Sequence, residues 1–229
     1  MTFIVKNTTL PSLPEVIAPH ICRGCNAIGS ILCERCKNHI IKTKQDICPE
    51  CKKPKLTLIC PNCNLPSTFC IGERNDLLDE LIHDFKYNSI RPIGKAFVDI
   101  LNEILPELSD NSVLVPLPTS NKHIRQRGID HTLFIAKRLA KKRNIKVQKL
   151  LIRAKDTVQV GADHSTRITQ ANKAYTINQK TKINSNYTYI LFDDVWTTGA
   201  SMKSAIKKLQ MAGAKNIIVV LLAVSKLSH

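Results

Sequence analysis

Aromatic and acidic residues are both scarce in this chain. Aromatics make up 5% of its 229 residues, and 18 Asp and Glu face 34 Lys and Arg. So few aromatics leave room for few base-stacking platforms. No apolar run reaches the roughly 18 to 20 residues that span a bilayer, and Pro11, Pro14 and Glu15 interrupt the start of the chain, where a signal peptide needs an unbroken apolar stretch. We therefore expect a cytoplasmic protein without membrane insertion.

Cysteine is absent after Cys70, and eight of the nine cysteines form four Cys-x-x-Cys pairs. Such a turn presents two thiolates to one metal ion, whereas a disulfide framework is disfavoured in a reducing cytoplasm. Eight thiolates fill two tetrahedral sites and leave no open position for a catalytic water, so we expect about two structural zinc ions. The predicted ligands are Cys22, Cys25, Cys33, Cys36, Cys48, Cys51, Cys60 and Cys63.

The spacing of these pairs is compatible with two arrangements. The pairs are separated by seven residues in the first half and eight in the second, which suits two small ribbons in series. A cross-braced arrangement, first pair with third and second with fourth, is the alternative. Cys70 stays outside both schemes and is expected to be a packed core or loop thiol.

Positive charge is concentrated in the second half of the chain. Residues 111–176 hold 14 Lys and Arg against three Asp. Such a field attracts phosphate-rich ligands and nucleic acid, although a solvated basic surface would show the same composition.

Hydrophobic periodicity predicts two linking helices and then an α/β domain. The first helix begins near Asp76 as its N-cap, and the second covers 92–105 and ends before Pro106. From 113 onward, buried strands alternate with amphipathic helices, as in a parallel sheet covered on both faces. The predicted strands are 113–117, 147–152, 187–192 and 216–224, and the predicted helices are 129–143 and 201–212. The polar stretch 154–170 is expected to form a lid or a strand pair.

These patterns divide the chain into four segments. We predict an N-terminal lead at 1–17, a double zinc-ribbon module at 18–70, linking helices at 71–110 and the α/β domain at 111–229.

The sharpest motif follows the predicted strand 187–192. Two adjacent carboxylates, Asp193 and Asp194, end the strand, and the loop Thr197-Thr-Gly-Ala-Ser201 leads directly into a helix. A helix N-terminus with free N–H groups and nearby hydroxyls binds anions, and ligands of open α/β sheets lie beyond the carboxyl ends of strands. The carboxylates would repel a second anion, so their partners are sugar hydroxyls or a magnesium ion. A phosphorylated sugar would satisfy both halves of the motif, the carboxylate pair with its hydroxyls and the loop with its phosphate.

This motif resembles the phosphoribosyl-diphosphate signature of the type I phosphoribosyltransferases. Together with the loop from Pro116 to Ser120, the basic cluster around Arg127 and the four preceding Cys-x-x-Cys pairs, it is similar to the ComF/GntX family. That family joins a double zinc ribbon to a phosphoribosyltransferase domain. The resemblance extends from about residue 18 to 225 and implies the parallel-sheet fold of that enzyme class.

The resemblance also implies roles for individual residues. Asp193 and Asp194 would engage the ribose hydroxyls, with Arg167 as a further catalytic residue in a flexible loop at 159–175. Lys86-Tyr87 stands where the family shows a Lys-aromatic pair, but so short a pattern is weak and favours a solvated lysine at a helix end. The implied substrate-binding residues are Pro116, Leu117, Pro118, Thr119, Ser120, Arg125, Arg127, Val195, Trp196, Thr197, Thr198, Gly199, Ala200 and Ser201.

Two functions follow from this resemblance. The first is a DNA-uptake protein of natural transformation that binds phosphoribosyl diphosphate, magnesium and single-stranded DNA, with other competence or DNA-processing proteins as possible partners. The second is a nucleobase salvage phosphoribosyltransferase. The zinc module and the basic segment 111–176 favour the first. A transcriptional regulator ranks last because no helix-turn-helix pattern is present.

Overall fold

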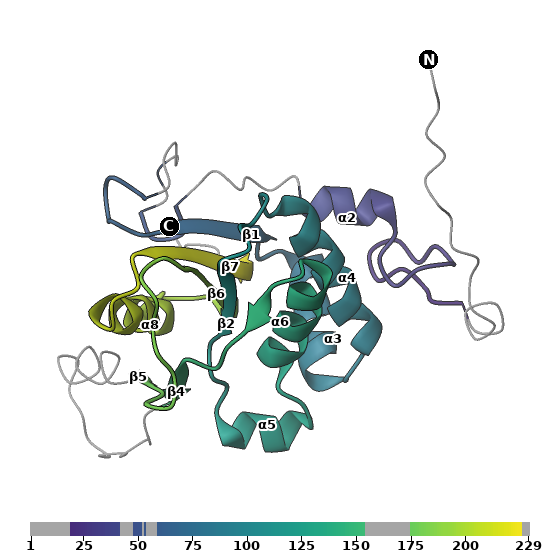
Figure 1. Ribbon diagram of the computed structural model, residues 1–229. Helices are drawn as coiled ribbons and strands as arrows, with labels where there is room; N and C mark the ends of the chain where they lie inside the picture. Colours follow the sequence, from purple (N-terminus) through teal and green to yellow (C-terminus); the bar gives the residue numbers. More distant parts are fainter. Residues whose placement is uncertain (1–18, 42–47, 52, 54–58, 154–174, 226–229) are drawn as a thin grey trace, which may run out of the picture.

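The computed structural model describes residues 19–41, 48–51, 53, 59–153 and 175–225. Within these ranges a five-stranded sheet of order β1-β7-β6-β2-β3 forms the centre of the molecule (Figure 1). All neighbouring strands in it run parallel. The strands are β1 (Ser67–Glu73), β2 (Ser112–Pro116), β3 (Lys146–Val147), β6 (Thr188–Trp196) and β7 (Asn216–Val224).

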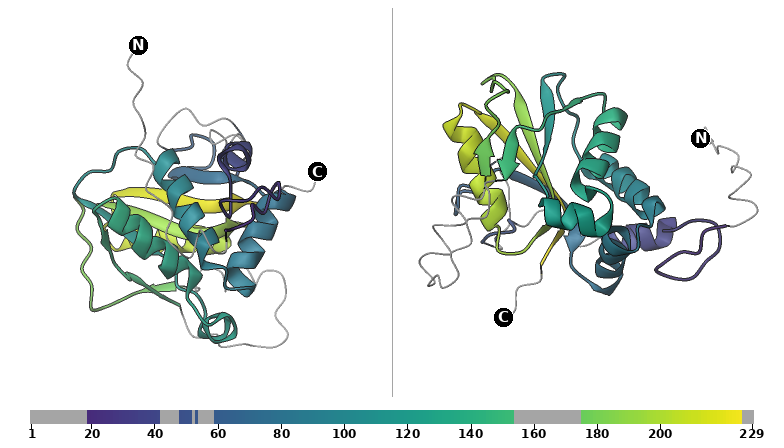
Figure 2. Two further views of the ribbon diagram at one scale, coloured as in Figure 1. Left: turned by 90° about the vertical axis from the view of Figure 1, so that its right-hand side faces the viewer. Right: turned by 90° about the horizontal axis from the view of Figure 1, so that it is seen from below.

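Helices cover both faces of this sheet. On one face lie α3 (Asp76–Tyr87), α4 (Arg91–Ile104) and α6 (His131–Lys142), and α8 (Ala200–Met211) lies on the other (Figure 2). Successive side chains along a strand point to opposite faces of the sheet. Ile190 and Phe192 pack with α3, α4 and α6, whereas Tyr189 and Leu191 pack with α8. The predicted parallel-sheet α/β fold is confirmed.

The remaining elements are short. They are α2 (Glu34–Ile41), α5 (Asn121–Arg127), β4 (Leu151–Arg153) and β5 (Tyr175–Ile177). β4 and β5 form a separate antiparallel pair. The strand predicted at 147–152 is therefore two strands in two sheets, because β3 follows β2 whereas β4 turns away to pair with β5.

The start of α3 differs from the prediction by one residue. Asn75, not Asp76, is the N-cap: its backbone is extended and its side chain accepts a hydrogen bond from the backbone N–H of Leu78 at 2.9 Å. Asp76 lies in the first turn, where a negative charge interacts favourably with the helix dipole.

The segment 18–70 contributes to the sheet as well as to the cysteine groups. β1 begins at Ser67 and pairs with β7 at the sheet edge, with Cys70 buried in it as the sequence predicts for a core thiol. Ile40, next to the first cysteine group, belongs to the α3-α4-α6 face. Cys48 and Cys60 belong to the α8 face. The two halves of the segment thus lie against opposite faces of the sheet.

Candidate functional site

The eight paired cysteines form two groups, and the grouping is sequential. Cys22, Cys25, Cys33 and Cys36 make one group, and Cys48, Cys51, Cys60 and Cys63 make the other. In each, all four Sγ atoms lie within 4.8 Å of one another. This decides between the two arrangements that the spacing allowed, and the cross-braced one is wrong.

The geometry of both groups fits zinc. Zn–S bonds of about 2.3 Å in a tetrahedron place sulfurs about 3.8 Å apart. The Sγ atoms of Cys25 and Cys33 are 3.6 Å apart. In the second group, the Cys48–Cys63 and Cys51–Cys60 separations are 3.4 and 3.5 Å. Each group could hold one ion with four thiolates, which is a structural and not a catalytic ligand set.

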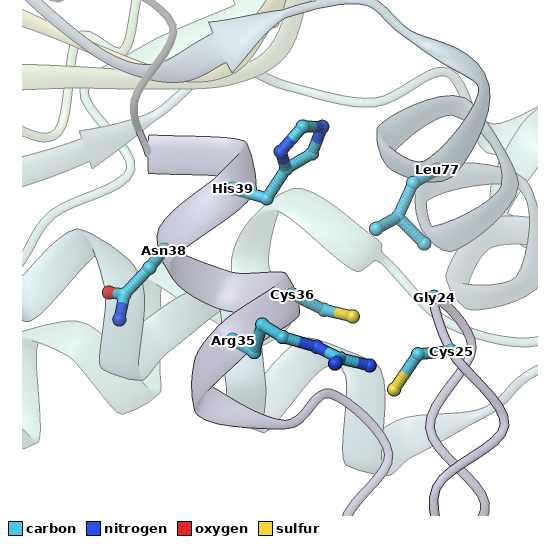
Figure 3. Close-up of a pocket in the computed structure, with 7 residues that line it drawn as sticks. All are labelled: Gly24, Cys25, Arg35, Cys36, Asn38, His39 and Leu77. Atoms are coloured by element: carbon cyan, nitrogen blue, oxygen red, sulfur yellow. The ribbon is translucent and has the colours of Figure 1, made fainter.

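The first group adjoins a pocket of about 540 Å³ between α2 and α3 (Figure 3). Cys25, Arg35 and Cys36 line it, together with Leu77 from α3. A backbone hydrogen bond from Ala27 and a side-chain bond from Arg35 lower the pKa of Cys25 to about 6, which favours the thiolate that a metal requires.

The two predicted catalytic carboxylates lie near the carboxyl end of β6, between β7 and β2. Asp193 and Asp194 are both half-buried. The backbone N–H of Asp194 donates to Asp193 Oδ1 at 2.9 Å, and that of Val195 donates to Asp194 Oδ1 at 2.6 Å. These bonds fix both carboxylates at the edge of the sheet where ligands of parallel α/β proteins bind.

The two carboxylates differ in their charge environment. Burial, reinforced by the charge of Asp194, raises the pKa of Asp193 to about 7. Asp194 instead forms an ion pair with Lys86 Nζ, and both side chains are sheltered, at 14% and 22% exposure. Lys86 and Arg153 both lower the pKa of Asp193 against the larger effect of burial.

The loop after β6 has the geometry that an anion site needs. Gly199 adopts a left-handed conformation with φ of +71°, and a Cβ there would lie 2.2 Å from the Trp196 ring, so only glycine fits. A hollow of about 60 Å³ remains above the loop, and the residues from Val195 to Ser201 all line it with Asp193.

The predicted loop from Pro116 to Ser120 lies beside the acidic pair. β2 neighbours β6 in the sheet, and the backbone N–H of Leu117 donates to the Phe192 carbonyl at 2.9 Å. Pro118, Thr119 and Ser120 line a pocket of about 470 Å³. The structure thus brings both predicted substrate loops to the same edge of the sheet.

The predicted arginines have different surroundings. Arg127 is half-buried: it donates to the Tyr87 hydroxyl at 3.0 Å, and its guanidinium carbon lies 4.8 Å from the centre of that ring. Arg125 is exposed on the same helix, α5. Arg167 and most of the predicted flexible loop at 159–175 fall outside the described residues.

Several cations at this edge were absent from the predicted site. The pocket of about 470 Å³ is also lined by Lys122, Lys149 and Arg153. Arg153 ends β4, and only the antiparallel pairing of β4 with β5 brings it near the acidic pair. The sequence favoured a solvated lysine at position 86, and this expectation is wrong because the ammonium group of Lys86 pairs with Asp194.

Solved structures of phosphoribosyltransferases resemble part of the chain. Adenine phosphoribosyltransferase from Giardia lamblia matches with a TM-score of 0.41 and 12% identity over 67% of this chain and 86% of that enzyme. Glutamine phosphoribosylpyrophosphate amidotransferase from B. subtilis matches with a TM-score of 0.40 and 15% identity over 56% of this chain and only 25% of that enzyme. At these scores the matches identify neither a substrate nor a reaction for this chain.

Curated proteins give a relationship that extends over most of the chain, whereas no protein-family model matches it. The competence protein ComFC of Streptococcus pneumoniae is 23% identical over 82% of this chain and 85% of its own length. ComFC of Bacillus subtilis is 24% identical over 80% of this chain and 79% of its own length. The predicted resemblance is confirmed: the chain is similar to ComFC proteins over about four fifths of its length, and it joins a parallel-sheet α/β domain to two four-cysteine groups.

Proposed function

We propose that this protein binds phosphoribosyl diphosphate at the edge of its sheet and single-stranded DNA on its basic surface, and that it acts in DNA uptake as a competence protein of the ComF type. One observation carries the first part. Asp193 lines one hollow with the loop 197–201, and β6, which carries both carboxylates, neighbours β2, whose following loop lines a second pocket through Pro118–Ser120. A sugar with phosphate groups at both ends needs a site for its hydroxyls between two sites for phosphate.

Each part of the ligand has a matching group. Ionised Asp193 and Asp194 accept hydrogen bonds from the 2′ and 3′ hydroxyls of the ribose. The small hollow over Thr197–Ser201 takes the 5′-phosphate at the N-terminal end of α8, where the first backbone N–H groups of a helix have no partner within the helix. The N–H of Ala200 donates to Thr198 Oγ1 at 3.4 Å, a long hydrogen bond that a phosphate oxygen can replace. The 116–120 loop receives the diphosphate, with Arg127 and Arg153 close to it.

Magnesium fits this arrangement as a companion of the ligand. The carboxylates of Asp193 and Asp194 are oxygen donors of the kind that Mg²⁺ prefers, but Lys86 already neutralises one of them. When bound with the diphosphate, the ion supplies charge neutralisation between the two phosphates. The protein's own part is to orient the ribose and to hold the phosphates with fixed cations.

The DNA-binding part of the proposal rests on exposed cations. Lys137 and Lys141 lie exposed one turn apart on α6, within the predicted basic segment 111–176. The similarity to proteins named competence protein ComFC supports a role in competence. Zinc in both cysteine groups would have a structural role, and other DNA-processing proteins of the cytoplasm are the partners we expect.

The pocket of about 470 Å³ beside the loop 116–120 gives less support to a nucleobase salvage enzyme. The ten residues that line it include three cations and neither an aromatic ring nor a carboxylate. A purine or pyrimidine gains affinity from stacking and from hydrogen bonds to its edges, whereas this lining suits a negatively charged group.

Calorimetry with phosphoribosyl diphosphate and magnesium tests the proposal. The double variant Asp193→Asn, Asp194→Asn keeps the size of both side chains but removes their charges, so it should weaken binding about 100-fold, as expected for two charge-assisted hydrogen bonds. The variant Glu107→Gln, Asp110→Asn removes two exposed acidic charges elsewhere and should bind normally. Equal affinity in wild type and the Asp193/Asp194 variant would refute the site. Release of diphosphate with a nucleobase would support the salvage enzyme.

A further inference from the structure

The end of α3 closes the proposed sugar-phosphate site. Its last two residues reach the two parts of the site that the sequence predicts: Lys86 pairs with Asp194, and Tyr87 accepts a hydrogen bond from Arg127. α3 follows the cysteine-containing segment directly and is not part of the predicted α/β domain. The position of α3 therefore decides how the acidic pair is neutralised.

The first cysteine group holds the same end of α3 from the other side. Arg23, inside the Cys22-x-x-Cys25 turn, forms an ion pair of 3.2 Å with Asp84. Asp84 is a buried residue, and its other carboxylate oxygen accepts from Asn88 at 2.7 Å. A buried carboxylate needs such partners, because an unpaired one is costly.

Asp84 and Lys86 project in different directions from the helix. Two residues along an α-helix correspond to a rotation of about 200°, so the two side chains lie on nearly opposite sides. Phe85, between them, is fully packed against Phe97, Phe134 and His131. The last turn of α3 is thus clamped between the cysteine turn and the acidic pair.

A second contact joins the same turn to α3. Gly24 packs so closely on this helix that a Cβ would lie 2.8 Å from Leu77 Cδ2 and 2.7 Å from Cys36 Sγ (Figure 3). The cysteine turn therefore touches α3 both near its first turn and in its last turn. A metal ion that orders the four thiolates also orders Arg23 and Gly24, which lie between two of them in the sequence.

We propose that the first four-cysteine group is a positioning element of the sugar-phosphate site. Through Arg23 and Asp84 it sets the end of α3, and this holds Lys86 against Asp194. Arg23 and Asp84 are positioning residues, whereas Lys86 faces the ligand. The role of Lys86 toward the ligand rests on the proposed function, but its placement by Arg23 does not.

The test measures the exposure of Lys86 directly, in the zinc-loaded full chain. An amine-acetylating reagent, followed by peptide mass spectrometry, reports how fast Lys86 reacts. The variant Arg23→Gln should raise that rate about fivefold, the factor for a loss of one modest interaction. Zinc content by metal analysis should stay at wild type, because Arg23 is not a ligand. Affinity for phosphoribosyl diphosphate should fall by a similar factor.

Lys37→Gln is the matched control. Lys37 also joins the first cysteine segment to the body of the protein, through Glu103 of α4 at 2.8 Å, but it does not contact α3 among the described ion pairs. Its loss removes one cation from the same region and should leave the Lys86 rate unchanged.

A second variant keeps the test decisive if Arg23→Gln loses metal. Asp84→Asn breaks the same ion pair from the α3 side, outside the cysteine turn, and should raise the Lys86 rate equally. In the double variant Arg23→Gln, Asp84→Asn the two increases in the Lys86 rate should not add, because each single variant already loses the same ion pair. An unchanged Lys86 rate in metal-loaded Asp84→Asn would overturn the proposal. The Lys86 rate could also rise while neither the wild type nor any variant binds phosphoribosyl diphosphate. That result would support the positioning of Lys86 by Arg23 and Asp84 and refute the proposed function.

Discussion

The Thr119 hydroxyl donates a hydrogen bond to Asp130 Oδ1 at 3.1 Å and so joins the loop after β2 to the start of α6. The same carboxylate oxygen accepts from the backbone N–H of Leu133 at 3.0 Å and is the N-cap of the helix. The carboxylate of Asp130 is therefore occupied in holding the predicted diphosphate loop.

Replacing Asp130 with Ala should destabilise the protein by about 1 kcal/mol, the usual effect of losing an N-cap. Urea unfolding followed by circular dichroism measures this change. Asp130→Asn keeps an acceptor for the helix and should retain most of the stability. If Asp130→Ala unfolds at the wild-type urea concentration, the cap contributes nothing.

The single tryptophan of the chain makes the two cysteine groups distinguishable. Trp196 is buried in the same apolar cluster as Cys48 and Cys60, whereas the first group lies against the other face of the sheet. Cys48→Ser should release about one of two zinc ions and shift the tryptophan emission, because loss of one thiolate unravels a site whose metal supplies on the order of 10 kcal/mol.

Cys22→Ser is the matched comparison, since it should also release one ion but leave the emission nearly unchanged. Metal analysis and fluorescence spectra of both variants measure the two effects. Equal emission shifts in both variants would show that the groups are not separate. Full metal retention in Cys48→Ser would show that Cys48 is not a ligand.

The pKa of Asp193, raised to about 7 by burial and by the charge of Asp194, predicts a pH-dependent stability. In the unfolded chain an aspartate titrates near about 3.9, so the folded protein keeps a proton that the unfolded chain has released. This contribution to stability is complete below about pH 4 and is lost as the pH rises through about 7.

Asp193→Asn resembles the protonated acid at every pH and isolates this effect. Without magnesium, the wild type should lose stability relative to this variant as the pH rises from about 4 to about 8. Urea unfolding of both proteins across that range is the measurement. Parallel stability curves would mean that Asp193 titrates normally.

The proposed DNA surface predicts a particular salt dependence. Each phosphate contact with a single strand contributes about −0.7 to the slope of log affinity against log salt concentration. The variant Lys137→Gln, Lys141→Gln removes two exposed cations of α6 and should flatten the slope by about 1.4. Fluorescence anisotropy with a labelled oligonucleotide at several salt concentrations measures it.

Two neighbouring cations are unsuitable for that experiment, and the structure shows why. Arg143 donates to the carbonyls of Leu105 and Pro106 at the end of α4, and Lys142 pairs with Asp99. Changing Arg143 would remove hydrogen bonds that hold the end of α4, and Lys142 already neutralises a neighbouring carboxylate. Lys207→Gln, Lys215→Gln removes two exposed charges outside the basic segment and serves as the control. An equal change of slope in both variants would place DNA elsewhere on the surface.

The sequence by itself was sufficient for features that depend on neighbours along the chain. The Cys-x-x-Cys turns, the strand that ends in Asp193 and Asp194, and the loop before α8 are local patterns, because spacing and periodicity of 2 or 3.6 residues define them. For the same reason the linking helices and most strands of the parallel sheet were predicted within a few residues. β1 was missed, since its mixed Ser, Thr, Cys and Gly composition gives no strand pattern and only pairing with β7 buries it.

Only the tertiary structure decided which distant groups meet. The ion pair of Lys86 with Asp194 and the approach of Arg153 to Asp193 join residues tens of positions apart or more, and the structure also chose between the two cysteine groupings that the spacing allowed. Nothing in the local sequence specifies such contacts, because they depend on how helices pack on the sheet. The sequence could thus name the carboxylates and the loop before α8, but the cation that neutralises Asp194 comes from a helix whose position is set by packing and, in our proposal, by the Arg23–Asp84 pair.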